Sequence, residues 1–544
     1  MDRTASQRAL IISHTQRHVR VLKALLADLQ LPDAAIASNQ QDASQFLAAN
    51  HCHLIICVCQ SAASDPVFAI CLQLKQTNQI PPDAGILMIS DKADAEMVNA
   101  MLDIQPDDFL ITPFTNHLAT ERLTRLLHRK QALRPVFQSA ASGRYVEALA
   151  DLETLLGGQP SQDIYPLALK LKGELLARSG KLEGAKTFYE SVLALQTFTW
   201  ARTGLIGCLI ELEAFPDAEK QILSLTLHPS TAIIAYDLLS LLHLRLKDYD
   251  SAFEATTLAC ELSPNNVTRH HDTVRIARLS KDFEGTVNAA QNLLHCTQRN
   301  NLHDPQYYLL CARACIDLAM TTDASQTRTL IERSRHLTRQ LEEQFTADVD
   351  REDLIVIRAR LLYLENEVSN ARQLLTTLEV ARWPLQSDET LIDKAKALHE
   401  VGLRQHALKI LNFLEKRSQH GHNDEIISAY IAQQKHDKED IAFPSRALND
   451  RAVRAFREQQ FSEALVILQQ AFRLMPKNPA IALNLLQATL HQLTHNANAA
   501  TVSWVKLKRW IDECQSAIES STLNEEQHIR YQRLQVAMAA TLSQ

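Results

Sequence analysis

The chain has 544 residues, of which 46% are hydrophobic and 22% charged, a composition typical of globular proteins and unlike that of disordered or fibrous ones. Only 12 residues are glycine, well below the usual ~7%, which predicts a mostly helical protein and argues against a large sandwich, barrel or propeller. The net charge of -7 gives no electrostatic support to nucleic-acid binding.

Residues 1–130 alternate short apolar runs with amphipathic stretches, the pattern of an α/β fold with a parallel sheet. The clearest helix is predicted at Thr15–Leu29, where valine and leucine recur every three or four residues. Nearly continuous apolar strands predict a sheet that is covered on both faces. The five runs that predict strands are residues 8–14, 34–38, 53–59, 85–90 and 108–112.

The segment Asp107–Phe114 reads DDFLITPF and resembles the D-D-F-L-x-K-P-F segment in the receiver domain of two-component response regulators. The resemblance implies a flavodoxin-like domain over residues 1–130 with strand order 2-1-3-4-5. It also implies a cis peptide bond before Pro113. Ser90 and Phe109 then match the switch serine or threonine and the switch aromatic residue of the family.

The residues that carry the phosphorylation chemistry of receivers are replaced in this chain. The resemblance places Ser13 and His14 where receivers hold Mg²⁺ with acidic residues, Val58 at the phosphoacceptor aspartate, and Thr112 at the lysine before the proline. Phosphoryl transfer needs a nucleophile and a divalent cation, and valine offers no lone pair. We therefore predict a pseudo-receiver; the alternative is a receiver with a displaced acceptor.

From residue 134 onward, recurring small and aromatic residues predict pairs of helices. Ala148, Ala185, Ala218, Ala252 and Thr286 follow one another at intervals of 37, 33, 34 and 34 residues. This period resembles that of the tetratricopeptide repeat, in which small residues let two helices approach closely. The signature residues are Gly143, Tyr145, Ala148, Gly180, Ala185, Ala218, Tyr249 and Ala252, with Phe461 and Ala464 in a late copy.

The repeat signature varies along the chain. It is clear at 134–300, divergent at 301–432 with weak copies at Ala371 and Ala407, and clear again in a C-terminal stretch at 448–544 that ends in a capping helix. Residues 433–443, rich in lysine and acidic residues, predict a loop or linker. Because one helix pair cannot bury its own apolar face, the array must stack and present a long surface to protein partners.

One aromatic residue and one basic segment stand out in the array. Trp200 matches the aromatic packing position of the tetratricopeptide repeat, so we expect it in the core. Arg269, His270 and His271 begin a repeat helix, where they either line the groove or are merely exposed.

We expect no metal, cofactor or enzymatic activity. His14 and His18 stand four residues apart without a third ligand, and the sequence has no glycine-rich phosphate loop. The ten cysteines form no C-x-x-C pair, and several lie in apolar runs, which favours reduced thiols in the cytoplasm. No apolar stretch approaches the ~20 residues that span a bilayer, so we expect no membrane insertion.

Together the two resemblances imply a bacterial signal-transduction adaptor, similar to response regulators that carry a repeat array as output. The alternatives are a conventional phosphorelay response regulator and an assembly scaffold unrelated to signalling. The Asp107–Phe114 segment is kept although the acidic pocket is lost. This predicts that the face formed by the fourth helix, fifth strand and fifth helix pairs two copies in a homodimer or docks onto the first repeats through residues 116–133.

Overall fold

The computed structural model describes residues 8–59, 65–92, 95–300, 302, 304–322, 324–345, 349–378, 380–420, 424–495, 501–521 and 523–542. The chain divides into two compact units. Unit 1 comprises Met1–Thr273 with His295–His303, and unit 2 comprises Val274–Leu294 with Asp304–Gln544.

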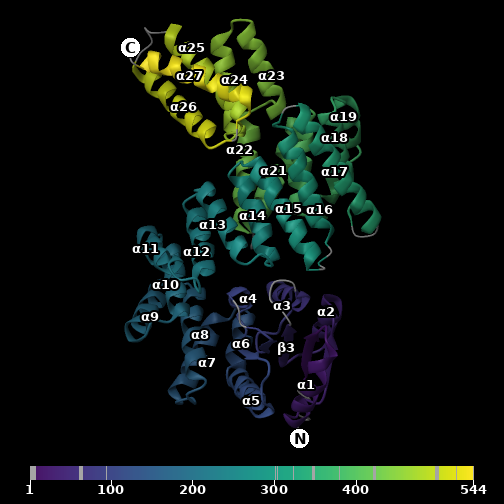
Figure 1. Ribbon diagram of the computed structural model, residues 1–544, viewed down its shortest axis with the longest axis vertical. Helices are drawn as coiled ribbons and strands as arrows, with labels where there is room; N and C mark the ends of the chain where they lie inside the picture. Colours follow the sequence, from purple (N-terminus) through teal and green to yellow (C-terminus); the bar gives the residue numbers. More distant parts are fainter. Residues whose placement is uncertain are drawn as a thin grey trace. The chain divides into compact units, whose positions relative to one another are not determined.

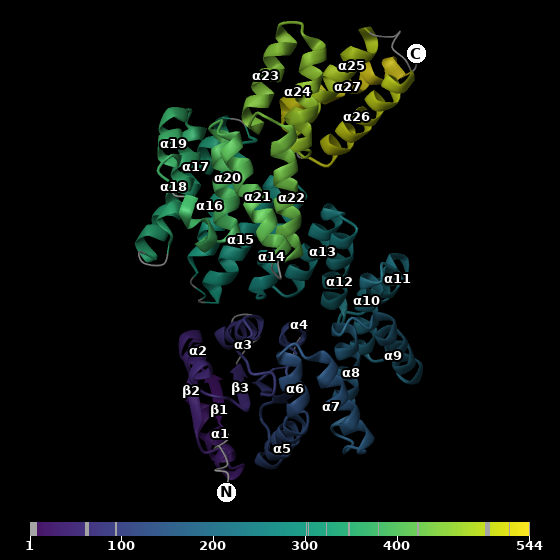
Figure 2. The same ribbon diagram turned by 180° about the vertical axis from the view of Figure 1, so that it is seen from behind.

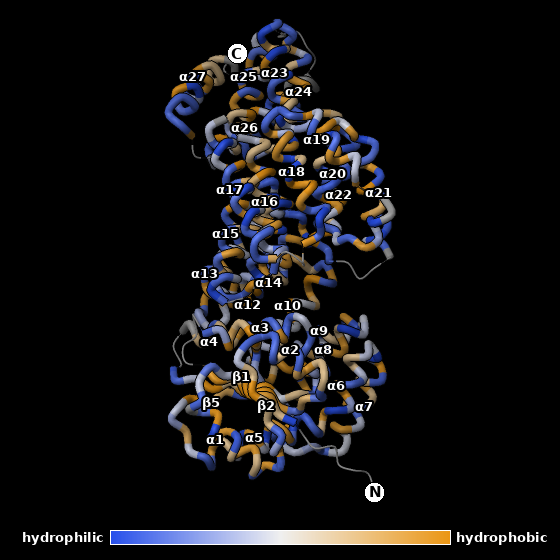
Figure 3. Tube along the Cα trace, turned by 90° about the vertical axis from the view of Figure 1, so that its right-hand side faces the viewer, coloured by the Kyte–Doolittle hydropathy of each residue, from blue (hydrophilic) through white to orange (hydrophobic). Residues whose placement is uncertain are grey.

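Unit 1 begins with a five-stranded parallel sheet (Figures 1 and 2). Its order is β2-β1-β3-β4-β5, as predicted, and each predicted strand is present. Strands β1, β3 and β4 are buried along their whole length, and β1 is strongly hydrophobic in the coloured trace (Figure 3). The strands are β1 Ala9–Ser13, β2 Ala34–Ala37, β3 Leu54–Cys59, β4 Gly85–Ser90 and β5 Asp108–Ile111.

Helices cover both faces of this sheet. Leu22 of α1 and Leu123 and Leu126 of α5 pack against one face, whereas Phe68 of α3 and Met97 of α4 pack against the other. Each face is apolar because successive residues of a strand point to opposite sides, and every residue of the central strands is apolar or small. The helices are α1 Gln16–Asp28, α2 Gln40–Ala49, α3 Pro66–Gln76, α4 Ala95–Ile104 and α5 Asn116–Ala132.

The sheet is followed by a helical repeat array. In unit 1 its helices are α6 Arg134–Ala141, α7 Tyr145–Gly157, α8 Tyr165–Arg178, α9 Leu182–Leu195, α10 Thr199–Glu211, α11 Phe215–Thr226, α12 Ala232–Arg245 and α13 Tyr249–Leu262. Two further helices, α14 Val267–Leu279 and α15 Phe283–Arg299, contribute residues to both units.

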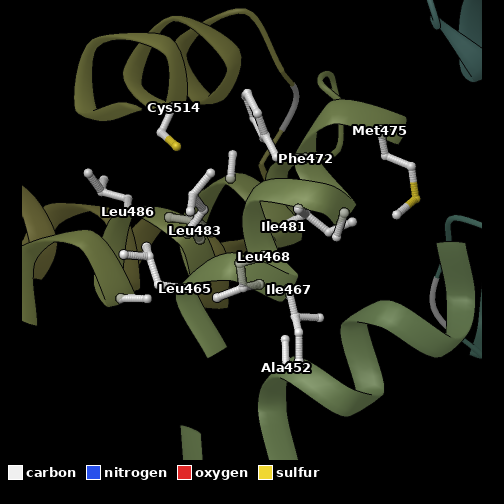
Figure 4. Packing of buried hydrophobic residues seen from close by; sticks show 14 of the residues in the cluster. Ala452, Leu465, Ile467, Leu468, Phe472, Met475, Ile481, Leu483, Leu486 and Cys514 are labelled. Atoms are coloured by element: carbon white, nitrogen blue, oxygen red, sulfur yellow. The ribbon is translucent and has the colours of Figure 1, made fainter. Parts of the chain in front are cut away.

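Unit 2 consists of helices in its described part. They are α16 Pro305–Ala319, α17 Ala324–Gln344, α18 Arg351–Leu364, α19 Val368–Leu375, the 3-10 helix η1 Val380–Leu385, α20 Asp388–Glu400, α21 Arg404–His420, α22 Glu425–Asp440, α23 Ser445–Arg457, α24 Phe461–Leu474, α25 Pro479–His495, α26 Thr501–Glu519 and α27 Glu525–Leu542. Its C-terminal helices share an apolar core that includes Leu468, Leu483 and Cys514 (Figure 4).

The small residues of the repeat signature occupy one position, the fourth residue of the second helix in each pair. Seven of them are alanines with no exposed surface: Ala148, Ala185, Ala218, Ala252, Ala371, Ala407 and Ala464. Thr286 takes this position in α15 and is 1% exposed. Thr327 takes this position in α17, so the register continues through the segment in which the alanine signature is absent.

The turn inside eight of the helix pairs also repeats one backbone conformation. The residue two positions before the second helix has a positive φ, between 55° and 81°. These residues are Gly143, Gly180, Glu213, Lys247, Lys281, Asn366, Gly402 and Gln459. A left-handed conformation costs a residue other than glycine ~1 to 2 kcal/mol, yet five of these turns accept that cost. Glycine at this position therefore identifies only three of the eight turns in the sequence.

The predicted loop at residues 433–443 is wrong for most of its length, because α22 continues to Asp440. The charges that suggested a loop form ion pairs with neighbouring helices. Lys435 pairs with Glu415 at 2.7 Å, and Asp437 accepts from Lys281 at 2.7 Å. All ten cysteines are buried and free. In the described part of the chain, no helix is both long and apolar enough to cross a membrane.

Candidate functional site

The carboxyl ends of the strands bring together four residues that the sequence placed in a degenerate receiver pocket. Ser13 ends β1 and lies opposite Val58 of β3, while Ser90 ends β4 beside Ile111 of β5, which Thr112 follows. Val58 is 3% exposed and belongs to the apolar core that α1 and α5 cover. A valine held in this way has no atom that can accept a phosphoryl group.

The hydroxyl groups of Ser13 and Thr112 bind neighbouring groups of the chain. The Oγ of Ser13 accepts a hydrogen bond from the backbone N–H of Thr15 at 3.2 Å, and the hydroxyl of Thr112 donates to Asp91. His14 is exposed. Within the described ranges, no three His, Cys, Asp or Glu side chains are grouped as metal ligands.

The DDFLITPF segment fixes β5 to its neighbours. Asp107 accepts from the backbone N–H of Ile86 at 2.9 Å and pairs with Lys130 of α5 at 3.0 Å. Asp108 pairs with Arg122 of α5 at 2.6 Å. The peptide bond before Pro113 is cis, as the resemblance implied.

A buried ion pair joins the α/β domain to the repeats within unit 1. Asp103 of α4 accepts hydrogen bonds from both terminal nitrogens of Arg269 in α14, at 2.6 and 3.2 Å, and from the hydroxyl of Ser263 at 2.7 Å. Arg269 also donates to Asp237 of α12 at 2.8 Å. Burial alone would lower the pKa of Arg269, but hydrogen bonds to Asp237 and Asp103 raise it. The guanidinium therefore stays charged.

Two further contacts extend this junction. Asn99 of α4 donates to the carbonyl of Leu262 at 3.1 Å. Gln76 of α3 donates to Asn266 at 3.0 Å and accepts from Thr268 at 2.6 Å. Helices α3 and α4 therefore contact the repeats around the turn between α13 and α14.

The two expectations for Arg269, an exposed side chain or a groove residue, are both wrong. Its side chain is 6% exposed, and two carboxylates from separate elements neutralise its charge. His270 is also buried, and its Nε2 lies 2.9 Å from the carbonyl of Pro264. Burial lowers the pKa of His270. No sequence pattern pairs Asp103 with Arg269, which stand 166 residues apart.

A cavity of about 880 Å³ lies between the α4–β5–α5 face and the repeats of unit 1. Its wall on the α/β side includes Val98, Met101 and Phe109. Its repeat side includes Leu167 of α8, Trp200 of α10 and Ile234 of α12, with Lys170 and Glu174 beside them. Volumes of roughly 300 to 1,000 Å³ with an apolar lining and a few charged groups are typical of ligand sites. We name this cavity the junction cavity.

Trp200 lies in the wall of the junction cavity and is only half-buried, so the expectation of a core position holds in part. Its ring stacks on Phe198 at 5.6 Å and meets the edge of Tyr189 at 6.3 Å. Tyr189 is held between α8 and α10, because a Cβ at Gly173 or Gly204 would come within 2.4 Å of its ring.

This packing gives a testable contrast between two glycines of α10. Gly204→Ala is expected to lower the free energy of unfolding by about 1 to 3 kcal/mol, because the new methyl group must displace Tyr189. Gly207 has open space around its Cβ position, so Gly207→Ala should raise the free energy by about 0.5 to 1 kcal/mol. Urea unfolding monitored by circular dichroism measures both, and equal effects of the two variants would refute this packing.

No protein-family model matches the sequence, and no curated protein matches it. Among solved structures, a tetratricopeptide repeat protein from Parabacteroides merdae is 16% identical, with 46% of this chain and 91% of that chain covered and a TM-score of 0.27. The APC/C heterotetramer Cut9–Hcn1 is 12% identical, with 77% and 99% covered and a TM-score of 0.25. The repeat array of this chain is defined by its own helix pairs and their common turn.

Proposed function

We propose that this chain is a cytoplasmic signal-transduction adaptor of the bacterial two-component type, without enzymatic activity. In this chain, a pseudo-receiver domain and a tetratricopeptide array together bind a protein partner. The observation that carries the proposal is the junction cavity, whose walls come from both the α4–β5–α5 face and the repeats. In receivers this face carries the output, and here it is already in contact with the array.

The lost phosphorylation chemistry supports a constitutive role for that face. Val58 stands in the apolar core, and the hydroxyl of Thr112 is engaged by Asp91. The DDFLITPF segment, in contrast, anchors β5 and presents Phe109 to the junction cavity. The α4–β5–α5 face has lost the phosphorylation that would switch it, so it is suited to a permanent contact.

Partner capture tests the proposal. Val98 is 41% exposed in the wall of the junction cavity, so Val98→Glu adds a charge there without burying it in a core. Val146 of α7 is 67% exposed and does not line the cavity, so Val146→Glu is the matched control. We expect affinity purification with mass spectrometry to recover the same partner with the parent and Val146→Glu, and to lose it with Val98→Glu. Equal recovery with all three chains would contradict the proposal.

A second test addresses the receiver alternative. Beryllofluoride with Mg²⁺ mimics the phosphorylated carboxylate of receivers and needs the acidic residues that this chain replaces. We expect the methyl resonances of Ile89 and Ile111, at the ends of β4 and β5, to stay unchanged when it is added to the full chain. Saturable shifts of these resonances would favour a conventional response regulator with a displaced acceptor.

A further inference from the structure

Unit 2 contains a charged cluster in its interior, carried by the first helices of successive pairs. Arg360 of α18 is 1% exposed and contacts three carboxylates. It donates to Asp317 of α16 at 2.7 Å, to Asp393 of α20 at 2.6 Å and to Glu400 of α20 at 2.7 Å. Burying this many charges is costly unless each finds a partner.

Most of the neighbouring cations do find such partners. Lys396 pairs with Asp317 at 2.5 Å, and Lys281 pairs with Asp437 at 2.7 Å. Arg278 forms a two-point contact with Glu389, with distances of 2.6 and 2.7 Å. Its Nε, however, is buried and has no hydrogen-bond partner among the described residues.

Lys438 of α22 is the exception. Its side chain is more than nine-tenths buried, and its Nζ donates to the amide oxygen of Gln434 at 2.7 Å. In the described part of the chain, no carboxylate lies within ion-pair distance of this Nζ. Burial and the nearby charge of Lys396 lower the pKa of Lys438 to about 8. An ammonium group can donate three hydrogen bonds, so two of its donors remain available.

A cavity of about 110 Å³ lies beside these groups. Arg278, Lys281, Arg360, Lys396 and Lys438 line it, and they face three carboxylates in the lining, those of Asp317, Glu400 and Asp437. The volume equals that of three or four water molecules at ~30 Å³ each and is far below the roughly 300 Å³ of a small drug-sized site. An occupant must therefore be small, and the ammonium of Lys438, whose hydrogen-bond partner is an amide oxygen and not a carboxylate, favours a hydrogen-bond acceptor.

We propose that this cavity of unit 2 binds a small oxyanion, a carboxylate or phosphate group, at the ammonium group of Lys438. The oxyanion completes the ion pairing that the carboxylates of the chain leave unfinished. Such a group reaches the cavity either as a free anion or as an acidic side chain of a bound partner. This site is separate from the junction cavity, so its test is independent of the proposed function.

The experiment titrates the full chain with sodium phosphate and with sodium acetate at constant ionic strength, the balance being sodium chloride. Calorimetry and thermal unfolding are the readouts. We expect saturable binding and a rise in the unfolding midpoint. Lys438→Met keeps the apolar stem without the charge and should weaken binding by at least about tenfold, the loss of one charged hydrogen bond. Lys409 of α21 is exposed, so Lys409→Met is the matched control and should bind as the parent does.

A blocked triglutamate peptide separates the two sources of the oxyanion. Peptide binding that phosphate displaces assigns the site to an acidic side chain of a partner, whereas phosphate binding without peptide binding assigns it to a free anion. The proposal is overturned if neither phosphate nor acetate binds the parent saturably. It is also overturned if a folded Lys438→Met chain binds phosphate as tightly as the parent does.

Discussion

Replacing Arg360 by methionine is expected to lower the free energy of unfolding of unit 2 by about 3 to 5 kcal/mol. The substitution removes the cation that Asp317, Asp393 and Glu400 share and leaves their carboxylates buried with reduced compensation. Methionine fills most of the volume of the arginine stem, so the loss reports on charge more than on a cavity. Urea unfolding of the full chain, followed by far-ultraviolet circular dichroism, measures it.

The matched control is an exposed ion pair. Arg509 and Glu513 of α26 are 2.7 Å apart on the surface, where such pairs contribute ~0 to 1 kcal/mol. Arg509→Met should therefore change the free energy of unfolding by less than about 1 kcal/mol. Similar effects of the two substitutions would show that Arg360 does not hold the interior together.

The same cluster gives unit 2 a dependence on pH. Burial alone would raise the pKa of Asp317, but the charges of Lys396 and Arg360 hold this pKa below its ordinary range. A carboxylate with a lowered pKa in the folded state stabilises that state above its unfolded pKa of about 3.9, and this contribution is lost as the pH falls below that value. We expect the urea midpoint of unit 2 to decrease as the pH is lowered from 5 to 3. A midpoint that stays constant over this interval would contradict the ion pairing of Asp317.

The second large effect is expected at the helix contact of a repeat. Ala252 has no exposed surface and is the fourth residue of α13, which packs on α12. Ala252→Leu should lower the free energy of unfolding by about 1 to 3 kcal/mol or more, because the added atoms force the two helices apart. Ala194 of α9 is exposed, so Ala194→Leu should leave the thermal midpoint nearly unchanged. A parent-like midpoint for Ala252→Leu would mean that the repeat register is wrong.

Much of the fold follows from local patterns in the sequence. The strands β1, β3 and β4 are buried on both faces, so each residue had to be apolar or small, and their runs stand out. The helix pairs are recognisable in the sequence where an aromatic residue precedes a small residue by three positions. The pair α16 and α17 was not recognised because Thr327 fills the alanine position, although Thr286 shows that threonine is accepted there.

The candidate sites were predicted less well, because they depend on contacts between distant segments. Nothing near Asp103 in the sequence points to Arg269, and the walls of the junction cavity come from separate helices. The charged residues of α22 are typical of a loop when the local sequence alone is read, because their ion-pair partners lie on other helices. Lys281, 156 residues away, pairs with Asp437 of this helix.

The contact between Asp103 and Arg269 holds the α4 face against the repeats, and a double-mutant cycle tests it most directly. Asp103→Asn, Arg269→Met and the double variant are compared with the parent by urea unfolding of the full chain. We expect a coupling energy of about 1.5 to 3 kcal/mol, the range for hydrogen bonds between charged groups. Single effects that add to within about 0.5 kcal/mol would show that the two residues do not interact, and the junction cavity would lose its support.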